Sequence, residues 1–205
     1  VYINLLVDTT ETATKYAYFD NISIKEVQGN HLVQTTSTSR PVYRNMSALN
    51  QDAIAWQGLT TYGNHIYACA YNNKIYKQTN GMGDFVAVTS TSKTWRGMTA
   101  TETAVYACAY GDYIYEDVGG TGNFVAITDT ARNWFAMTYD GTNLYACEYN
   151  GDVYIRYNNT GDFVPLNQTS RGWRGMAYLN GNVYACAVND NVYVRYNGTG
   201  DFVSL

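Results

Sequence analysis

Hydrophobic and polar positions recur with a period of 39 residues over most of the chain. Each period carries a Trp, a Tyr-Ala-Cys triplet, a further Tyr and a Gly-x-Phe-Val corner at matching places. The four periods begin at Trp56, Trp95, Trp134 and Trp173. Apolar residues in each period form four short runs without a sustained spacing of 3.6 residues. The pattern therefore predicts strands and few or no helices.

The residues between the apolar runs predict the turns. In the second period the strands are expected at 95–100, 105–110, 113–116 and 124–128. The second and third runs of every period are separated by a pair of Asn, Asp or Gly residues, and such pairs tolerate the positive φ of a tight hairpin turn. A Gly before the Phe recurs at 83, 122, 161 and 200. We expect it to adopt a backbone conformation that other residues avoid.

Four strands in about 40 residues, repeated in tandem, are the signature of a β-propeller blade. We therefore predict an all-β propeller of four tandem 39-residue, four-stranded blades at residues 56–205, closing into a ring. Residues 1–55 lie outside the repeat and predict a strand-rich appendage or linker. Two alternatives are a solenoid of stacked sheets and a degenerate fifth blade at residues 1–55.

Composition and cysteine spacing exclude several classes of function. The net charge of −4, with no basic cluster, argues against a nucleic-acid partner. No apolar run is long enough for membrane insertion. The four Cys, at 69, 108, 147 and 186, each stand one period apart and never in the close pairs of a zinc site. We expect buried, unpaired thiols, with neither metal nor cofactor.

Three segments resemble known families. "YAYFDNISIKEV" (16–27) resembles the closing strand of jelly-roll carbohydrate-binding modules, and "GNHLVQTTSTSRPVYR" (29–44) resembles linkers of bacteriophage tail and other virion proteins. "IYACAYNNKIYKQTNGMGDF" (66–85) resembles the blades of Asp-box propellers, found in sialidases and secreted binding proteins. Gln78, Asn80 and Met82 replace the Ser, Asp and Gly of that family's S-x-D-x-G-x-x-W motif. The W-x-G-M, Y-A-C and G-D-F pattern also resembles phage-encoded repeats. These resemblances imply a virion or extracellular location.

Catalysis is not indicated, because no hydrolase, metalloprotease or phosphate-loop motif is present. His31 and His65 are interpreted as ordinary surface residues. A ligand site is more plausible where aromatic rings and Arg side chains vary between periods, since rings stack on sugars and guanidinium groups bind hydroxyls. The predicted ligand-binding residues are Arg96, Arg174, Trp95, Trp173, Tyr110 and Tyr149.

The leading hypothesis is a non-catalytic binding module of a virion tail or surface protein. Its expected partner is a glycan or bacterial cell-surface receptor, and it would also contact other virion proteins and form a homo-oligomer. One alternative is a purely structural virion or decoration protein that makes only protein–protein contacts. A less favoured one is an Asp-box-type glycosidase.

Overall fold

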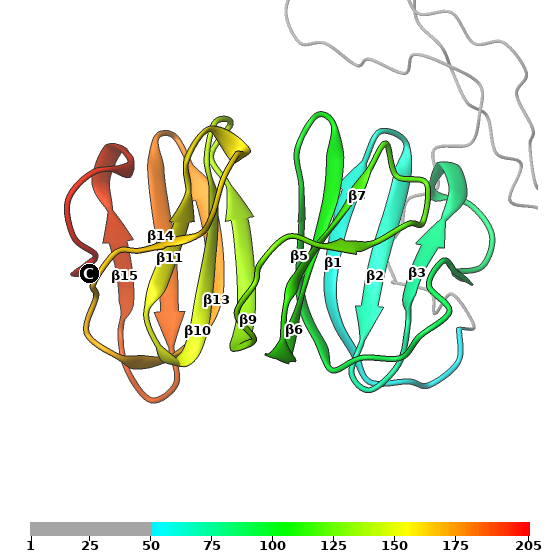
Figure 1. Ribbon diagram of the computed structural model, residues 1–205, viewed down its shortest axis with the longest axis horizontal. Coiled ribbons are helices and arrows are strands. Elements are labelled where there is room, and N and C mark those ends of the chain that lie inside the picture. The colour runs from blue at the N-terminus through cyan, green and yellow to red at the C-terminus, as the bar shows by residue number, and fades with distance from the viewer. Residues whose placement is uncertain (1–50) are drawn as a thin grey trace, which may run out of the picture. The chain divides into compact units, whose positions relative to one another are not determined.

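Each period folds into one four-stranded antiparallel sheet in the computed structural model (Figure 1). The structure describes residues 51–205. Residues 1–50 lie outside the described residues. They include His31 and most of the segment 1–55, which was expected to be an appendage or a fifth blade. The first sheet consists of β1 (Trp56–Tyr62), β2 (His65–Ala70), β3 (Ile75–Gln78) and β4 (Val86–Ala87). The second consists of β5 (Trp95–Ala100), β6 (Ala104–Asp112), β7 (Ile114–Val118) and β8 (Val125–Ala126).

The later two sheets repeat this plan. The third consists of β9 (Arg132–Tyr139), β10 (Leu144–Gly151), β11 (Val153–Arg156) and β12 (Val164–Pro165). The fourth consists of β13 (Arg171–Leu179), β14 (Asn182–Ala187), β15 (Val192–Arg195) and β16 (Val203–Ser204). The first strand of each sheet (β1, β5, β9 or β13) is called its inner strand. Short pairings of β6 with the beginning of β9, and of β10 with the beginning of β13, join neighbouring sheets.

The strand predictions are confirmed for the first three strands of the second sheet, but the fourth strand was predicted to be too long. β5 has the expected bounds, and β6 and β7 differ from prediction by one or two residues. The fourth strand was expected to span 124–128, but β8 has two residues, both exposed. An outermost strand has a partner on one side only, so its pairing is short. Helical structure is limited, within the described residues, to the 3₁₀ turns η1 (Thr79–Gly81), η2 (Tyr157–Asn159) and η3 (Tyr196–Gly198).

The turn predictions are confirmed by the backbone. The first residue of each hairpin pair has a positive φ: Asn72 (50°), Gly111 (69°), Asn150 (57°) and Asn189 (51°). The recurring corner glycines also have positive φ, as at Gly83 (72°) and Gly122 (92°). Asn tolerates this region better than other non-glycine residues, which explains why Asn and Gly exchange between periods.

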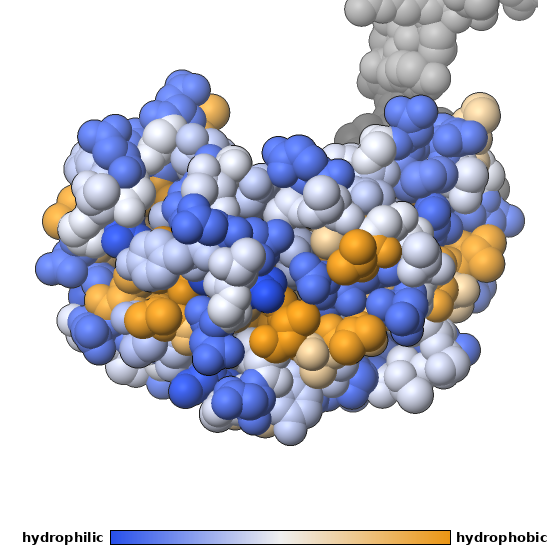
Figure 2. All heavy atoms as spheres, turned by 45° about the horizontal axis from the view of Figure 1, so that its top comes forward, coloured by the Kyte–Doolittle hydropathy of each residue, from blue (hydrophilic) through white to orange (hydrophobic). Residues whose placement is uncertain are grey.

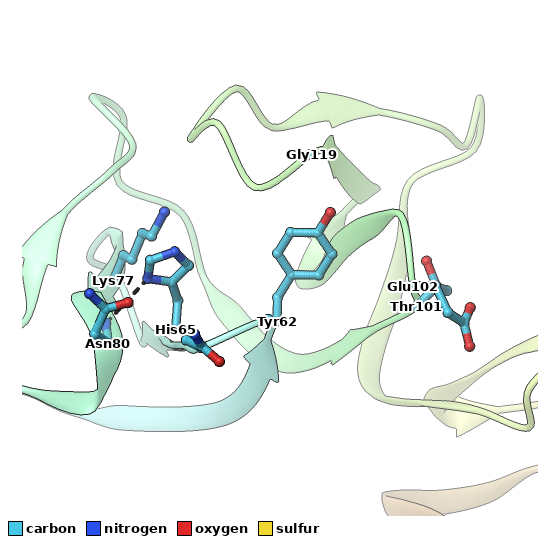
Figure 3. A pocket seen from close by; sticks show the side chains of 9 residues that line it. Tyr62, His65, Lys77, Asn80, Thr101, Glu102 and Gly119 are labelled. Atoms are coloured by element: carbon cyan, nitrogen blue, oxygen red, sulfur yellow. Dashed lines mark hydrogen bonds between the residues drawn. The ribbon is translucent and has the colours of Figure 1, made fainter.

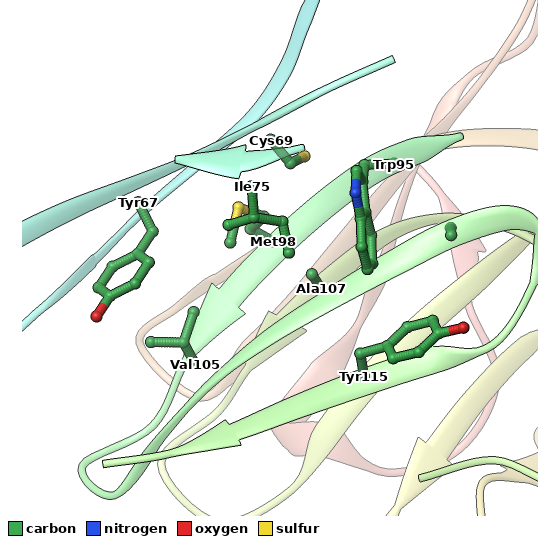
Figure 4. Close-up of a cluster of buried hydrophobic side chains, with 9 residues drawn as sticks. Tyr67, Cys69, Ile75, Trp95, Met98, Val105, Ala107 and Tyr115 are labelled. Carbon is green, nitrogen blue, oxygen red and sulfur yellow. The ribbon is translucent and has the colours of Figure 1, made fainter. Parts of the chain in front are cut away.

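The core lies between the sheets. Each sheet has a trailing face, which carries the Tyr and Cys of the Tyr-Ala-Cys triplet and an apolar residue of the third strand. It has a leading face on the other side, with the Trp and apolar residues of the first and second strands. Tyr67, Cys69 and Ile75 of the first sheet's trailing face pack on Trp95 and Met98 of the second sheet's leading face (Figure 4). The same arrangement recurs at the next two interfaces.

The four sheets do not close into the expected four-bladed ring. Among the described residues, the inner strands contact one another in sequence, β1 with β5, β5 with β9 and β9 with β13, and the first and fourth sheets do not pack face to face. The turn from one sheet to the next is therefore too small for four sheets to complete a circle. The described residues form an open stack of propeller-like sheets.

All four cysteines are free thiols, and three of them are buried between sheets. Burial raises the pKa of Cys69 and Cys147 to about 12. Cys186, on the outer side of the fourth sheet, is only half-buried. In the described part of the chain, no helix is long and apolar enough to cross a membrane.

Candidate functional site

Four of the six predicted ligand residues lie together in a ladder of guanidinium groups and aromatic rings. The Arg96 guanidinium lies 4.5 Å from the ring centroid of Tyr71, 5.6 Å from that of Tyr110 and 4.9 Å from that of Phe135. These distances are typical of cation–π contacts. Arg96 Nη1 also donates a hydrogen bond to Gln57 Oε1 at 3.1 Å.

The ladder continues into the fourth period. The Arg174 guanidinium lies 4.6 Å from the Phe135 centroid and 4.9 Å from that of Tyr149. Tyr149 in turn contacts Phe135 (5.9 Å between centroids) and Tyr110 (6.3 Å). The Phe135 ring therefore lies between the two guanidinium groups and makes a cation–π contact with each.

A backbone irregularity places the Arg side chains in this ladder. The pairing of β5 with β6 shifts register between Trp95 and Gly97, and the same shift occurs at Trp173 and Gly175. Such a bulge interrupts strict alternation. The Trp enters the core and Arg96 or Arg174 emerges at the beginning of the inner strand.

Phe135, like Tyr71, lies in the ladder but is not among the predicted ligand residues. Residues at matching positions of the four periods form a column, and Phe135 shares one with Gln57, Arg96 and Arg174. In the sequence, Phe135 interrupts the Arg residues of this column. The structure shows that the ring is the spacer on which both guanidinium groups stack. The alternation of Arg and Phe within one column was the available signal.

The structure corrects the assignment of Trp95 and Trp173. Both rings are 1% exposed, so neither offers a surface to a ligand. Each packs edge-on against a Tyr of its own sheet, Tyr115 or Tyr193, with centroids 5.1 Å apart. Their role in this structure is packing between sheets.

Charged residues two positions before the Trp also have structural partners. Lys93 Nζ lies 2.8 Å from an Asp112 carboxylate oxygen, and Arg171 Nη1 lies 2.6 Å from an Asp190 carboxylate oxygen. Burial alone would raise the pKa of Asp112, but hydrogen bonds from Lys93 and Tyr115 outweigh it and lower the pKa. These pairs tie the beginning of an inner strand to the nearby hairpin, so each charge already has a partner within the protein.

Replacing Arg96 by Ala should lower the free energy of unfolding by about 1–2 kcal/mol, because two close ring contacts and a hydrogen bond are lost. The matched variant Arg174→Ala should cost less, since Arg174 is exposed. Urea denaturation of both variants measures the difference. Equal costs would contradict the assignment of Arg96 to packing.

A cleft of about 380 Å³ opens at the opposite end of the inner strands, between the first and second sheets. The hairpins that follow β1 and β5 both line it. Figure 3 shows His65 and Lys77 on one side, Tyr62 in the middle and Glu102 on the other side. The cleft thus offers a cation, a carboxylate, an imidazole and an aromatic ring within one hollow.

Hydrogen bonds hold the cleft residues in place. The backbone N–H of Asn80 donates to His65 Nδ1 at 3.3 Å, and Lys77 Nζ donates to the Gly120 carbonyl at 3.3 Å. Gly120 has a φ of 63°, and a Cβ there would lie 2.8 Å from the Tyr62 ring. The glycine therefore allows the β7–β8 loop to lie against Tyr62.

The chemistry of this cleft departs from the repeat. At the next interface Glu116 stands in the column of Lys77 and accepts a hydrogen bond from the Tyr106 hydroxyl, which also accepts one from Asn159 Nδ2 at 2.6 Å. Arg156 lies 3.9 Å from the same carboxylate. There the polar groups satisfy one another within the protein. His65, interpreted from the sequence as an ordinary surface residue, is one of the residues that line this open cleft.

The described residues contain no cluster of three or more His, Cys, Asp or Glu side chains that could hold a metal ion. Figure 2 shows mainly hydrophilic side chains on the visible face, with apolar side chains in separate patches.

No family model and no curated protein matches the chain. Solved structures do. The computationally designed protein Ika4 matches with a TM-score of 0.58 and 14% identity, covering 73% of this chain and 95% of that one. The designed protein Ika8 matches with a TM-score of 0.60 and 17% identity, covering 77% of this chain and 51% of Ika8. The fold is β-propeller-like.

A natural protein shares the same fold. BamB from Moraxella catarrhalis matches with a TM-score of 0.50 and 19% identity over 63% of this chain and 39% of BamB. The chain therefore spans about half the length of Ika8 and two fifths of BamB. At these identities the likeness concerns the fold alone.

Proposed function

We propose that residues 51–205 form a non-catalytic glycan-binding module whose site is the cleft between the first and second sheets. The observation that carries the proposal is the composition of this cleft. A volume of about 380 Å³ lies within the usual range of small-molecule sites. Tyr62 supplies a ring edge or face for stacking, and Lys77, Glu102 and His65 supply donors and acceptors for hydroxyl groups.

The ladder is the second candidate surface for the same ligand class. It presents the Arg174 guanidinium, for which the described residues provide no hydrogen-bond acceptor. Arg96 is less suited, because rings cover its guanidinium and Gln57 accepts one of its hydrogen bonds. The predicted role of Tyr110 and Tyr149 as sugar-stacking residues belongs to this surface.

A virion tail or surface protein is the setting that we propose for this module, with a bacterial surface glycan or receptor as partner. The support is the resemblance of residues 16–27 and 29–44 to carbohydrate-binding and virion sequences. The rival proposal is a structural virion or decoration protein whose surfaces contact only other protein chains. It is favoured by the number of polar groups, such as those around Glu116, that are already satisfied within the protein.

The full-length chain should bind at least one saccharide on a broad glycan array. The double variant His65→Ala/Glu102→Gln should weaken that binding about tenfold or more, because each lost charged or polar contact is worth about 1–3 kcal/mol. Ala104 occupies the column of His65 in the next period, so the first change is compatible with the fold. Calorimetric titration with the bound saccharide measures the effect.

The matched control is Arg174→Gln, an exposed change at the opposite end of the inner strands. It should leave the affinity unchanged. Loss of binding in this control, with the cleft variant unaffected, would move the site to the ladder. An array without any bound saccharide, with all variants folded, would contradict glycan binding and favour the structural rival.

A further inference from the structure

The leading face of the first sheet is uncovered in the described residues. Leu59 is 68% exposed, whereas Met98 in the same column of the second sheet is 7% exposed. Trp56 is half-buried, whereas Trp95, Trp134 and Trp173 are 1% exposed. Around Trp56, Leu59 and Phe85 the surface forms an apolar hollow of about 400 Å³.

The trailing face of the fourth sheet is uncovered in the same way. Val192 is 48% exposed, whereas Ile75 in the matching column of the first sheet is 0% exposed. Tyr184 and Cys186 are half-buried, although their counterparts in the first three sheets are fully buried. The exposed residues at the two ends of the stack are thus the two halves of one type of interface.

Three internal interfaces show how these halves fit. At the first of them Ile75 of the trailing face and Met98 of the leading face belong to one buried cluster, and Figure 4 shows them together. The matching pair at the free ends is Val192 and Leu59. A fourth interface of the same kind would place the Val192 side chain over the apolar hollow beside Leu59.

Gly175 is compatible with a following sheet. A Cβ at Gly97 would lie 2.8 Å from Ala136 Cα and 2.9 Å from the Phe135 carbonyl oxygen, so Gly97 is required by the close approach of the next sheet. Gly175 stands in the same column, yet a Cβ there would meet only Cys186 Sγ. The third sheet has Ala136 at this position and still packs on the fourth sheet, so Gly175 leaves room for a following sheet but is not required by one.

We propose that two copies of this chain associate head to tail, with the trailing face of each fourth sheet on the leading face of the partner's first sheet. A head-to-tail contact produces a closed ring when the rotation between copies fits, and here two identical contacts would leave no free face. The proposal does not depend on the cleft, which lies within one copy.

Analytical ultracentrifugation of the full-length chain tests the proposal. We expect a mass of twice 22.9 kDa. Leu59→Lys should halve the mass, and so should Val192→Glu, because each buries a charge in an apolar interface. The matched control Val125→Lys changes a 56% exposed apolar residue on the outermost strand β8 and should leave the dimer intact.

Mixing the two variants supplies the sharper test. A Leu59→Lys chain keeps a normal trailing face and a Val192→Glu chain keeps a normal leading face, so the mixture should recover a dimer. One interface would be unaltered and the other would place Lys against Glu. Cys186 should react with a thiol reagent faster in either variant alone than in the wild type or the mixture.

A wild-type chain that is monomeric at every concentration overturns the proposal, as does a wild-type assembly larger than two copies. A dimer that Leu59→Lys and Val192→Glu leave intact, or that Val125→Lys dissociates, places the contact elsewhere and also overturns it. Folding of each variant is verified by circular dichroism and by its thermal transition, so a loss of mass reports on association.

Discussion

Gly97→Ala should destabilise the protein by about 3 kcal/mol, near the upper end of the cost of overpacking. The new Cβ would lie 2.8 Å from Ala136 Cα and 2.9 Å from the Phe135 carbonyl oxygen. Both atoms belong to the backbone of the next inner strand, so no side-chain rotation relieves the clash. The second and third sheets would have to separate, which would also disturb the contact of Arg96 with Phe135.

Chemical denaturation of the Leu59→Lys background measures this cost without a contribution from association. Gly175→Ala in the same background is the control, because its Cβ would approach only the Cys186 thiol. We expect it to cost about 1 kcal/mol, since a single side chain can shift. Similar losses for both variants would show that the distance between inner strands does not limit packing.

Asp117→Ala should cost about 3 kcal/mol or more. The Asp117 side chain is fully buried. Its carboxylate accepts hydrogen bonds from the backbone N–H groups of Thr121 (2.9 Å), Gly122 (2.8 Å) and Asn123 (3.2 Å), and from the Thr121 hydroxyl (2.9 Å). Removing a charged acceptor leaves several partly buried donors without this partner at once, which is more costly than the loss of one ordinary hydrogen bond.

The same column supplies the control for Asp117. In the other periods the side chain donates to the corner glycine: Gln78 Nε2 to the Gly83 carbonyl (2.6 Å), and Arg156 Nε to that of Gly161 (2.8 Å). Gln78→Ala removes one such bond and should cost about 1 kcal/mol. Thermal unfolding of both variants compares them. An Asp117→Ala variant as stable as Gln78→Ala would contradict the role of the carboxylate as the organiser of this corner.

Local features of this fold are predictable from sequence because they depend on a few neighbouring residues. A positive φ at Asn72 or Gly83 is a property of Asn and Gly themselves, so the turns could be placed within a residue. The alternation of apolar runs and turns then fixed the antiparallel sheets. The recurrence of the Trp did not reveal its position, since Trp95 and Trp173 were predicted to bind a ligand and are 1% exposed.

The candidate sites were less predictable, because each combines side chains from several periods. The variable column containing Arg96 and Arg174 pointed to the ladder, but the part of Phe135 became visible only when its ring was found between the two guanidinium groups. The cleft depends on loops that come together across two sheets. Tyr62 and Glu102 are 40 positions apart, and no motif connects them.

The sequence by itself determined the four-stranded repeat and its turns, because each follows from local chemistry repeated every 39 residues. Only the tertiary structure decided whether the stack closes. Closure depends on the rotation between successive sheets, which sums the packing of many side chains at each interface and has no single residue as its signature. That rotation leaves Leu59 and Val192 exposed at opposite ends of the stack.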